Sequence, residues 1–232
     1  MQQSLAFSRE AEMTPLVEVG VDQLTGRKKP DFVAREVQGA VGIVDLVAAR
    51  FEWNAVERRL SQGCGPIVQP LRVRALVATP RQRVIRTSTL ARRLHTRPEA
   101  LMRSTLRPLL EQGYVEISGD RVRRSNAWQP VVRSLTAIEL KRDNWRCALR
   151  QADNAQISAD RAWVVLDHHR VGPAEASRDL FHDYGVGLAT VNRTGRLRVH
   201  LRPRQSRSEA WYRAWMGELV WAQWLQQSLP SV

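Results

Sequence analysis

The stretch "TAIELKRDNW", residues 136–145, carries an apolar run into a glutamate-x-lysine pair and then into a polar segment that can begin a helix. Only Lys28, Lys29 and Lys141 are lysines among the 36 basic residues of the chain. Glu139 and Lys141 are two positions apart on an expected strand, so both side chains project from the same face. A lysine at this place in an arginine-rich chain needs a chemical explanation.

Further strands are expected on both sides of this stretch. Residues 33–51, "VAREVQGAVGIVDLVAARF", predict two strands joined by a glycine-containing turn, with Asp45 in the middle of the second strand. A carboxylate inside an apolar strand is costly unless it is paired or binds a cation. Downstream, the pattern predicts a helix and then three strands: "DNWRCALRQADNAQ", "AWVVLD", "YGVGLATVN" and "RLRVHLRP". Strand, helix and strand of these lengths indicate a parallel βαβ unit in an α/β core.

Positive charge is concentrated in one segment. The formal net charge is +13, and residues 66–128 hold thirteen arginines against four acids, a net of +9 that leaves +4 for the rest. Clustered arginine neutralises phosphates and releases their counterions, so this distribution favours a polyanionic partner. We expect DNA, in double-stranded form.

Several other classes of protein are disfavoured by the composition. No apolar stretch approaches the ~20 residues that span a bilayer, and the start of the sequence lacks a signal-peptide layout, so we expect a cytoplasmic protein without membrane contact. Cys64 and Cys147 belong to no ligand-spaced cluster, which argues against a zinc site. His168 and His169 follow an expected strand and are interpreted as polar loop residues.

The basic segment has its own order of elements. The patterns predict helix, short strand, helix, helix and hairpin in "PLRVRALVAT", "RVIR", "TSTLARRLH", "TRPEALMRSTLRPLLEQG" and "YVEISGDRVRRS". Residues 86–125 resemble the winged helix-turn-helix family, in which the second helix of the motif enters the major groove and the wing contacts the backbone. The resemblance implies DNA-contacting arginines on that helix and on the wing: Arg97, Arg103, Arg107, Arg121, Arg123 and Arg124. Alternatively, these arginines only solvate a small domain, or the wing contacts a protein.

The segments around it resemble the PD-(D/E)xK nuclease superfamily, over about residues 10–60 and 130–203. The matching motifs are Asp45 in "GIVDLV" and Glu139 with Lys141 in "IELK". In that family the aspartate and the acid-x-lysine pair converge at the open end of the sheet, and a helix follows directly. Val44 departs from the family, whose members carry proline before the aspartate.

Supporting residues are implied by the same resemblance. "ALRQA" is similar to a segment whose glutamine, here Gln151, lies near the active site in related bacterial proteins. Glu36 is expected as an additional carboxylate. Three acids of an expected N-terminal helix compete for that role: Glu10, Glu12 and Glu18.

The chemistry of phosphodiester hydrolysis accounts for these residue types. Mg²⁺, with Mn²⁺ as a substitute, prefers carboxylate and carbonyl oxygens, and it polarises the phosphoryl group. Asp45 and Glu139 would supply carboxylates, and the Leu140 carbonyl a third ligand. Lysine can lose its proton when it is desolvated, whereas arginine cannot, so Lys141 is suited to orient or help deprotonate the nucleophile. The plainer alternative is that Glu139 and Lys141 form an ordinary surface ion pair.

These observations predict an α/β protein with a restriction-endonuclease-like mixed sheet flanked by helices and an inserted winged-helix domain. The expected divisions are a first core part at 1–65, the insertion at 66–128, a second core part at 129–203 and a tryptophan-rich helix at 204–232 that packs on the core or on a partner, including a second copy. The expected function is a Mg²⁺-dependent DNA endonuclease. Two alternatives are a catalytically silent DNA-binding regulator and a nuclease subunit that a partner activates.

Overall fold

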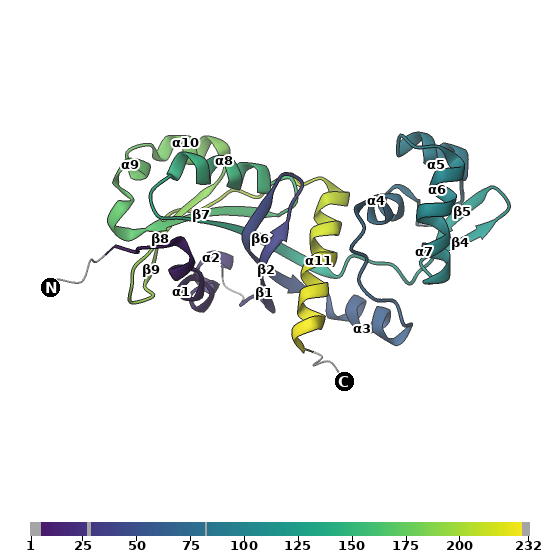
Figure 1. Cartoon of the computed structure of the whole chain (residues 1–232), viewed down its shortest axis with the longest axis horizontal. Coiled ribbons are helices and arrows are strands. Elements are labelled where there is room, and N and C mark those ends of the chain that lie inside the picture. The colour runs from purple at the N-terminus through teal and green to yellow at the C-terminus, as the bar shows by residue number, and fades with distance from the viewer. Residues whose placement is uncertain (1–5, 27–28, 82, 229–232) are drawn as a thin grey trace. The chain divides into compact units, whose positions relative to one another are not determined.

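The computed structural model describes residues 6–26, 29–81 and 83–228 (Figure 1). The chain divides into two compact units. The first, here called the sheet unit, comprises Met1–Arg50 and Ser134–Glu209, and the second, the helical unit, comprises Phe51–Arg133 and Ala210–Val232. The helical unit thus contains the basic segment 66–128 together with flanking residues and the C-terminal helix.

A six-stranded mixed sheet forms the centre of the sheet unit, in the order β1-β2-β6-β7-β8-β9. The strands are β1 (Phe32–Gln38), β2 (Ile43–Phe51), β6 (Val132–Lys141), β7 (Arg161–Asp167), β8 (Gly187–Val191) and β9 (Leu197–Leu201). β1 and β2 form an antiparallel pair, β6, β7 and β8 are parallel, and β9 returns antiparallel to β8. The predicted α/β class with a mixed sheet flanked by helices is therefore confirmed.

Helices cover both faces of this sheet (Figure 1). One face carries η1 (Glu10–Glu12), α1 (Thr14–Val19) and α2 (Asp22–Thr25), and the other carries α8 (Trp145–Ala155), α9 (Gly172–Glu175) and α10 (Arg178–Tyr184). Met13 and Val17 pack in one cluster with Ile138, Trp163 and Val165 of the strands. Since side chains alternate along a strand, β7 is buried on both faces, as is usual for a central parallel strand.

The helix α8 follows β6 directly, as the sequence predicts. The Asn144 side chain caps it by accepting a hydrogen bond from the Cys147 amide at 3.2 Å. Buried residues recur at helical spacing on the side that faces the sheet: Trp145, Ala148, Leu149, Ala152 and Ala155. The cap and this apolar face fix where β6 ends, and with it the position of Lys141.

The helical unit contains a second, three-stranded sheet in the order β3-β5-β4. Its elements before β6 are α3 (Trp53–Ser61), α4 (Pro70–Ala78), β3 (Ile85–Arg86), α5 (Thr87–Arg93), α6 (Pro98–Leu101), η2 (Met102–Leu106), α7 (Arg107–Glu111), β4 (Val115–Ser118) and β5 (Arg121–Arg124). β4 and β5 form the expected antiparallel hairpin. The helix α11 (Ala210–Ser228) packs against α4.

A turn of π-helix interrupts the long arginine-bearing helix of this unit. Pro108 lacks an amide hydrogen, and its ring cannot be accommodated below an unaltered α-helical turn. The segment Met102–Leu106 is wound as a π-helix, and α7 resumes at Arg107. The wider turn absorbs the proline, so α6, η2 and α7 continue as one helix whose apolar side includes Leu101, Leu106 and Leu109.

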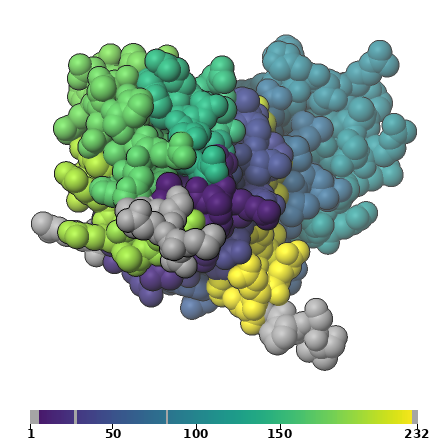
Figure 2. Space-filling model, turned by 60° about the vertical axis from the view of Figure 1, so that its left-hand side comes forward, coloured from purple at the N-terminus to yellow at the C-terminus, as the bar shows by residue number. Residues whose placement is uncertain are grey.

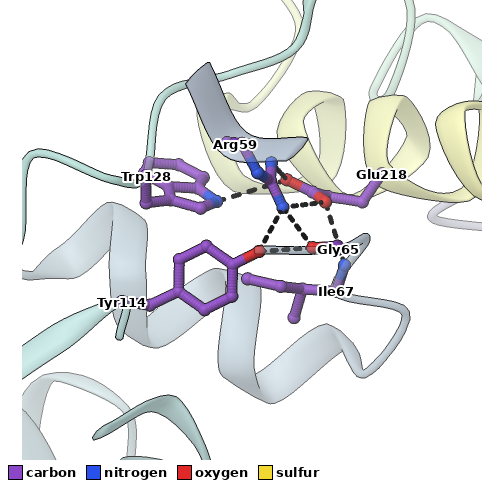
Figure 3. A network of polar contacts seen from close by, with 6 residues as sticks. All are labelled: Arg59, Gly65, Ile67, Tyr114, Trp128 and Glu218. Atoms are coloured by element: carbon purple, nitrogen blue, oxygen red, sulfur yellow. Dashed lines mark hydrogen bonds and ion pairs between the residues drawn. The ribbon is translucent and has the colours of Figure 1, made fainter. Parts of the chain in front are cut away.

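A buried polar network joins the separate segments of the helical unit (Figure 3). The Arg59 guanidinium donates to both carboxylate oxygens of Glu218, at 2.6 and 2.9 Å, and to the Tyr114 hydroxyl at 2.8 Å. Glu218 also accepts from the Ile67 amide and from the Trp128 indole. Burial alone would lower the pKa of Arg59, but the Glu218 charge and hydrogen bonds raise it. The network connects α3 and α11 with the residue that precedes β4.

Within residues 6–26, 29–81 and 83–228, no helix combines the length and the hydropathy that crossing a membrane requires.

Candidate functional site

Asp45 and the Glu139–Lys141 pair are brought together by neighbouring strands of the sheet unit. Asp45 lies on β2 and the pair lies at the end of β6, which is the next strand in the sheet. The Asp45 carboxylate accepts a hydrogen bond from the Leu140 amide at 2.7 Å and lies 3.9 Å from the Lys141 ammonium. Two stretches of chain that are 95 residues apart therefore meet through one side chain.

Glu139 is a buried carboxyl group next to another carboxyl group. It is 2% exposed, and its Oε2 atom has no hydrogen-bond partner among the described residues. Burial, and then the charge of Asp45, raise the pKa of Glu139 to about 8. Without a cation, Glu139 thus retains its proton at neutral pH, because ionisation would place two negative charges side by side in a desolvated site.

Lys141 is held in its charged form. Its ammonium group donates to Glu10 Oε2 at 3.2 Å and to the Leu140 carbonyl at 3.0 Å. Burial lowers the pKa of Lys141, but the charges of Asp45, Glu10 and Glu139 outweigh burial and raise it above its ordinary value. This differs from the expectation that desolvation frees the amine, because three carboxyl groups surround it. Lys141 is suited to stabilise negative charge rather than to remove a proton.

An open cavity of about 530 Å³ adjoins these residues. It is lined by residues of η1 and α1, of β1 and β2 and of β6: Glu10, Ala11, Thr14, Pro15, Arg35, Glu36, Asp45 and Leu140. The N-terminal segment lies against the sheet unit (Figure 2), where Phe7 donates its amide to Asp167 and Ser8 accepts from Arg142. This segment places Glu10 beside Lys141.

The backbone of Glu36 is strained at the wall of this cavity. The register joins Arg35 to Leu46 and Val37 to Val44, so Glu36 lies opposite Asp45. Its φ is 51°, and among the described residues only one other non-glycine residue, His95, has a positive φ. A non-glycine residue in this region within a strand is uncommon and costs free energy, which is typical of functional sites.

The competing N-terminal acids are distinguished by their contacts. Glu10 contacts Lys141 and lines the cavity, as described above. Glu18 is bound by the Arg35 guanidinium through bonds of 2.5 and 2.6 Å, and Glu12 contacts Ser8 and Arg193. The acids that line the cavity with Asp45 are therefore Glu10 and Glu36.

Gln151 does not line this cavity. It lies on α8, where its side-chain oxygen is 3.8 Å from the Cys147 sulfur. Sequence reasoning also missed Arg35, which lines the cavity and is held by a bidentate contact with Glu18. The only local signal for Arg35 is its place beside Glu36 in "VAREVQ".

The Asp45 and Glu139 carboxyl groups suit a hard divalent cation that takes only a few of its ligands from the protein. No group of three or more histidine, cysteine, aspartate or glutamate side chains arranged for a metal occurs in the part of the chain that the structure describes. Asp45 and Glu139 nevertheless supply adjacent carboxyl groups, and the buried Glu139 Oε2 is left without a donor. Mg²⁺ keeps several of its waters and binds through one or two carboxylates, so this pair suffices for it.

The predicted DNA-contacting arginines lie on the helical unit and differ in exposure. Arg97, Arg103, Arg107, Arg121 and Arg123 are exposed. A cavity of about 510 Å³ is lined by Arg103, Arg107 and the Gly119–Asp120 turn of the hairpin, together with Thr87, Pro98, Glu99 and Met102.

Arg124 is different because it is half-buried. It donates to the Leu76 carbonyl at 3.0 Å and lies over the Trp128 ring at 5.0 Å. Burial lowers the pKa of Arg124, and nearby Arg81 lowers it further. Its contacts are those of a residue that holds the hairpin to α4.

Comparison with protein-family models, with curated proteins and with solved structures finds no match for this chain.

Proposed function

We propose that the protein is a metal-dependent endonuclease that hydrolyses phosphodiester bonds of double-stranded DNA, with a restriction-endonuclease-like core in the sheet unit. The observation that carries the proposal is the Asp45–Glu139 carboxyl pair, with a buried unpartnered oxygen and the Lys141 ammonium 3.9 Å from Asp45. Buried groups without partners are rare in structural roles, and a strongly raised pKa in a cleft is typical of catalytic sites. A surface ion pair would have neither property.

The cation would be held by the Asp45 and Glu139 carboxylates and by the Leu140 carbonyl. Mg²⁺ or Mn²⁺ polarises the phosphoryl group and lowers the pKa of an attacking water. Glu139 would release its proton to solvent when its carboxylate binds the ion. The Leu140 carbonyl also accepts a hydrogen bond from Lys141, so its second lone pair is the one that would bind the ion.

Lys141 would then stabilise the charge that develops on the phosphate oxygens. Its raised pKa keeps the ammonium protonated, and Glu10 holds it at the edge of the cavity. A fixed cation in a partly desolvated site acts more strongly than in water and needs no reorganisation during the reaction. Glu36, strained and lining the same cavity, is suited to orient a water by accepting a hydrogen bond from it.

The helical unit would bind the duplex as a winged helix. The order helix, strand, helix, helix and hairpin supports this, as does the cavity that Arg103 and Arg107 form with the hairpin turn. In such modules the second helix enters the major groove and the hairpin follows the backbone. Arg97, Arg121 and Arg123 would add phosphate contacts, whereas Arg124 has a structural role.

A catalytically silent DNA-binding regulator is the second candidate. The bond from Lys141 to the Leu140 carbonyl favours it, because an ammonium group beside the third expected ligand opposes the binding of a cation there. A nuclease subunit that needs a partner would share this feature, since the partner could release Lys141.

Supercoiled plasmid separates these functions. We expect purified protein to nick it in Mg²⁺ or Mn²⁺ and not in EDTA, and expect Asp45→Ala to abolish nicking while duplex binding in EDTA is unchanged. Asp31→Ala, an exposed aspartate before β1, is the matched control. Binding of equal strength without nicking in any metal supports the regulator. Full nicking by Asp45→Ala would contradict the assignment of the site.

A further inference from the structure

A second cavity lies at the carboxyl ends of β7 and β8. It has a volume of about 240 Å³ and is lined by His168, Asn192, Arg196 and Arg198, without a carboxyl group. Both arginines are exposed, and neither forms an ion pair within the described part of the chain. Two guanidinium groups, an amide and an imidazole around one space form a set of hydrogen-bond donors that suits an anion.

The rim of this cavity is fixed by the turn between β8 and β9. Asn192 Oδ1 accepts hydrogen bonds from the Thr194 amide at 3.1 Å, the Thr194 hydroxyl at 2.8 Å and the Arg196 amide at 2.9 Å. Gly195 closes the turn with a φ of 78°, a conformation that glycine adopts without strain. Because the Asn192 oxygen is fully used, its NH₂ group is the part that can serve a ligand.

His168 is oriented by a buried chain of hydrogen bonds. Its Nδ1 lies 3.4 Å from the Thr190 hydroxyl, which lies 2.9 Å from His200 Nε2, and His200 Nδ1 contacts the Glu175 carboxylate. Thr190 is fully buried. When the Thr190 hydroxyl donates to His168 Nδ1, the ring hydrogen of His168 lies on Nε2 and can donate into the cavity. The ring is therefore positioned before any ligand arrives.

The cavity and the candidate active site lie at the same end of the parallel strands β6, β7 and β8. Lys141 pairs with Leu166, and Leu166 pairs with Thr190. Neighbouring strands are ~4.8 Å apart, so Lys141 and Thr190 are separated by about 10 Å along the sheet. A duplex advances ~3.4 Å per nucleotide, so a few nucleotides of one strand span this separation.

We propose that the cavity of His168, Asn192, Arg196 and Arg198 binds a phosphate group of the DNA backbone, a few nucleotides from the phosphate that reacts beside Lys141. The claim that a phosphate reacts beside Lys141 rests on the function proposed above. The claim that a backbone phosphate binds in this cavity does not depend on hydrolysis. Guanidinium forks and amide groups match phosphate oxygens, and contacts of this kind fix the register of nucleic acid on a protein.

The test compares a cavity variant with a charge-matched control, both in the full chain. Arg196→Gln with Arg198→Gln removes the two guanidinium groups, and Arg161→Gln with Arg178→Gln removes the same charge from exposed positions outside the cavity. Dissociation constants of a short duplex are measured in EDTA at increasing KCl concentration. The logarithm of the dissociation constant rises linearly with log[KCl]. We expect this slope to be smaller by about 0.9 in the cavity variant and to stay at the wild-type value in the control.

A phosphate titration and the plasmid-nicking assay, read together with the duplex slope, separate failure of the phosphate site from failure of the proposed nuclease. Unchanged slope in the cavity variant, or no duplex binding by the wild type, overturns the proposal. Inorganic phosphate is titrated into ¹⁵N-labelled protein; shifts confined to 192–198 with an unchanged duplex slope would assign the cavity to a free phosphate compound and also overturn it. A reduced slope without nicking in any metal retains the phosphate site and rejects the nuclease.

Discussion

Glu139 of the sheet unit and Glu218 of the helical unit are both buried carboxyl groups, 2% and 1% exposed, in opposite surroundings. Glu218 accepts from Arg59, from the Ile67 amide and from the Trp128 indole. Glu139 has a second carboxyl group, Asp45, as its neighbour, and its Oε2 has no partner in the described chain. The same residue type is neutralised by its own protein in one unit and left incomplete in the other.

This contrast distinguishes a structural buried charge from a functional one. A carboxylate that receives several donors and a cation is already satisfied, and a ligand could only disturb it. A carboxyl group beside another acid is satisfied by a proton or by a cation from solution. Under the proposed function, Glu139 is thus the residue whose surroundings would change most when an ion binds, and Glu218 is the residue whose removal should destabilise the fold most.

The largest effect is expected from breaking the satisfied pair. Glu218→Ala leaves the Arg59 guanidinium buried without its carboxylate, and removal of one partner of a buried pair costs about 3–5 kcal/mol of the free energy of unfolding. Urea unfolding measures it. The exposed Glu111→Ala is the control, with a change within ~0.5 kcal/mol.

A double replacement refines this test. Arg59→Met with Glu218→Leu removes both charges, so we expect it to cost less than Glu218→Ala alone, because no uncompensated charge stays buried. A double variant that loses the sum of both single effects would show that the network acts through packing alone.

The next effect concerns the incomplete site. Lys141→Ala and Lys141→Arg should each slow plasmid nicking by about 10²–10³-fold, the usual loss when one fixed charge-stabilising donor is removed. We expect arginine to fail as well, because its planar guanidinium differs in shape and hydrogen-bond geometry from the compact ammonium that contacts Glu10 Oε2 and the Leu140 carbonyl. Initial rates in Mg²⁺ measure this, with the exposed Lys29→Ala as control. Nicking by Lys141→Arg at the wild-type rate would reject the assigned role.

Glu139 should also make the stability of the metal-free protein depend on pH. Its pKa is about 8 in the folded protein against 4.5 ordinarily, so the folded state binds the extra proton between these values. The free energy of unfolding therefore falls as pH rises from 4.5 to 8, by at most about 1.4 kcal/mol per pH unit. Above that range Glu139 contributes no further change. In EDTA, Glu139→Gln should lack this slope relative to the wild type.

Magnesium should reverse the effect. An ion that binds only the folded, deprotonated site stabilises it in proportion to its affinity, so Mg²⁺ should raise the wild-type unfolding midpoint more at pH 8 than at pH 6 and should not raise that of Glu139→Gln. Parallel pH profiles for the two proteins would contradict the burial argument.

The sequence could predict the strands of the sheet unit and the residues that they carry, because both depend on local pattern. Alternation in "IELK" places Glu139 and Lys141 on one face, and the apolar run "GIVDLV" makes Asp45 a strand residue. The mixed sheet and the helix after β6 follow from the same patterns, and the structure confirms them.

Other parts depend on contacts between distant residues. Arg59 and Glu218 are 159 positions apart, and a single acid within "WMGELVW" is the only local sign of their pairing. Glu10, Glu12 and Glu18 are equivalent by sequence, because only tertiary contacts show which of them meets Lys141. Likewise, the strained φ of Glu36 follows from its place opposite Asp45 and not from its residue type.

The smallest expected effect repeats the contrast within a single strand. Arg121 and Arg124 both lie on β5, but Arg121 is exposed, whereas Arg124 donates to the Leu76 carbonyl and stacks on Trp128. Arg124→Ala should lower the free energy of unfolding by about 1–2 kcal/mol and leave the salt dependence of DNA binding unchanged. Arg121→Ala should leave stability unchanged and lower the salt slope by about 0.9. If both variants lower the slope equally, the half-buried guanidinium also reaches a phosphate, and burial does not separate the two roles in this hairpin.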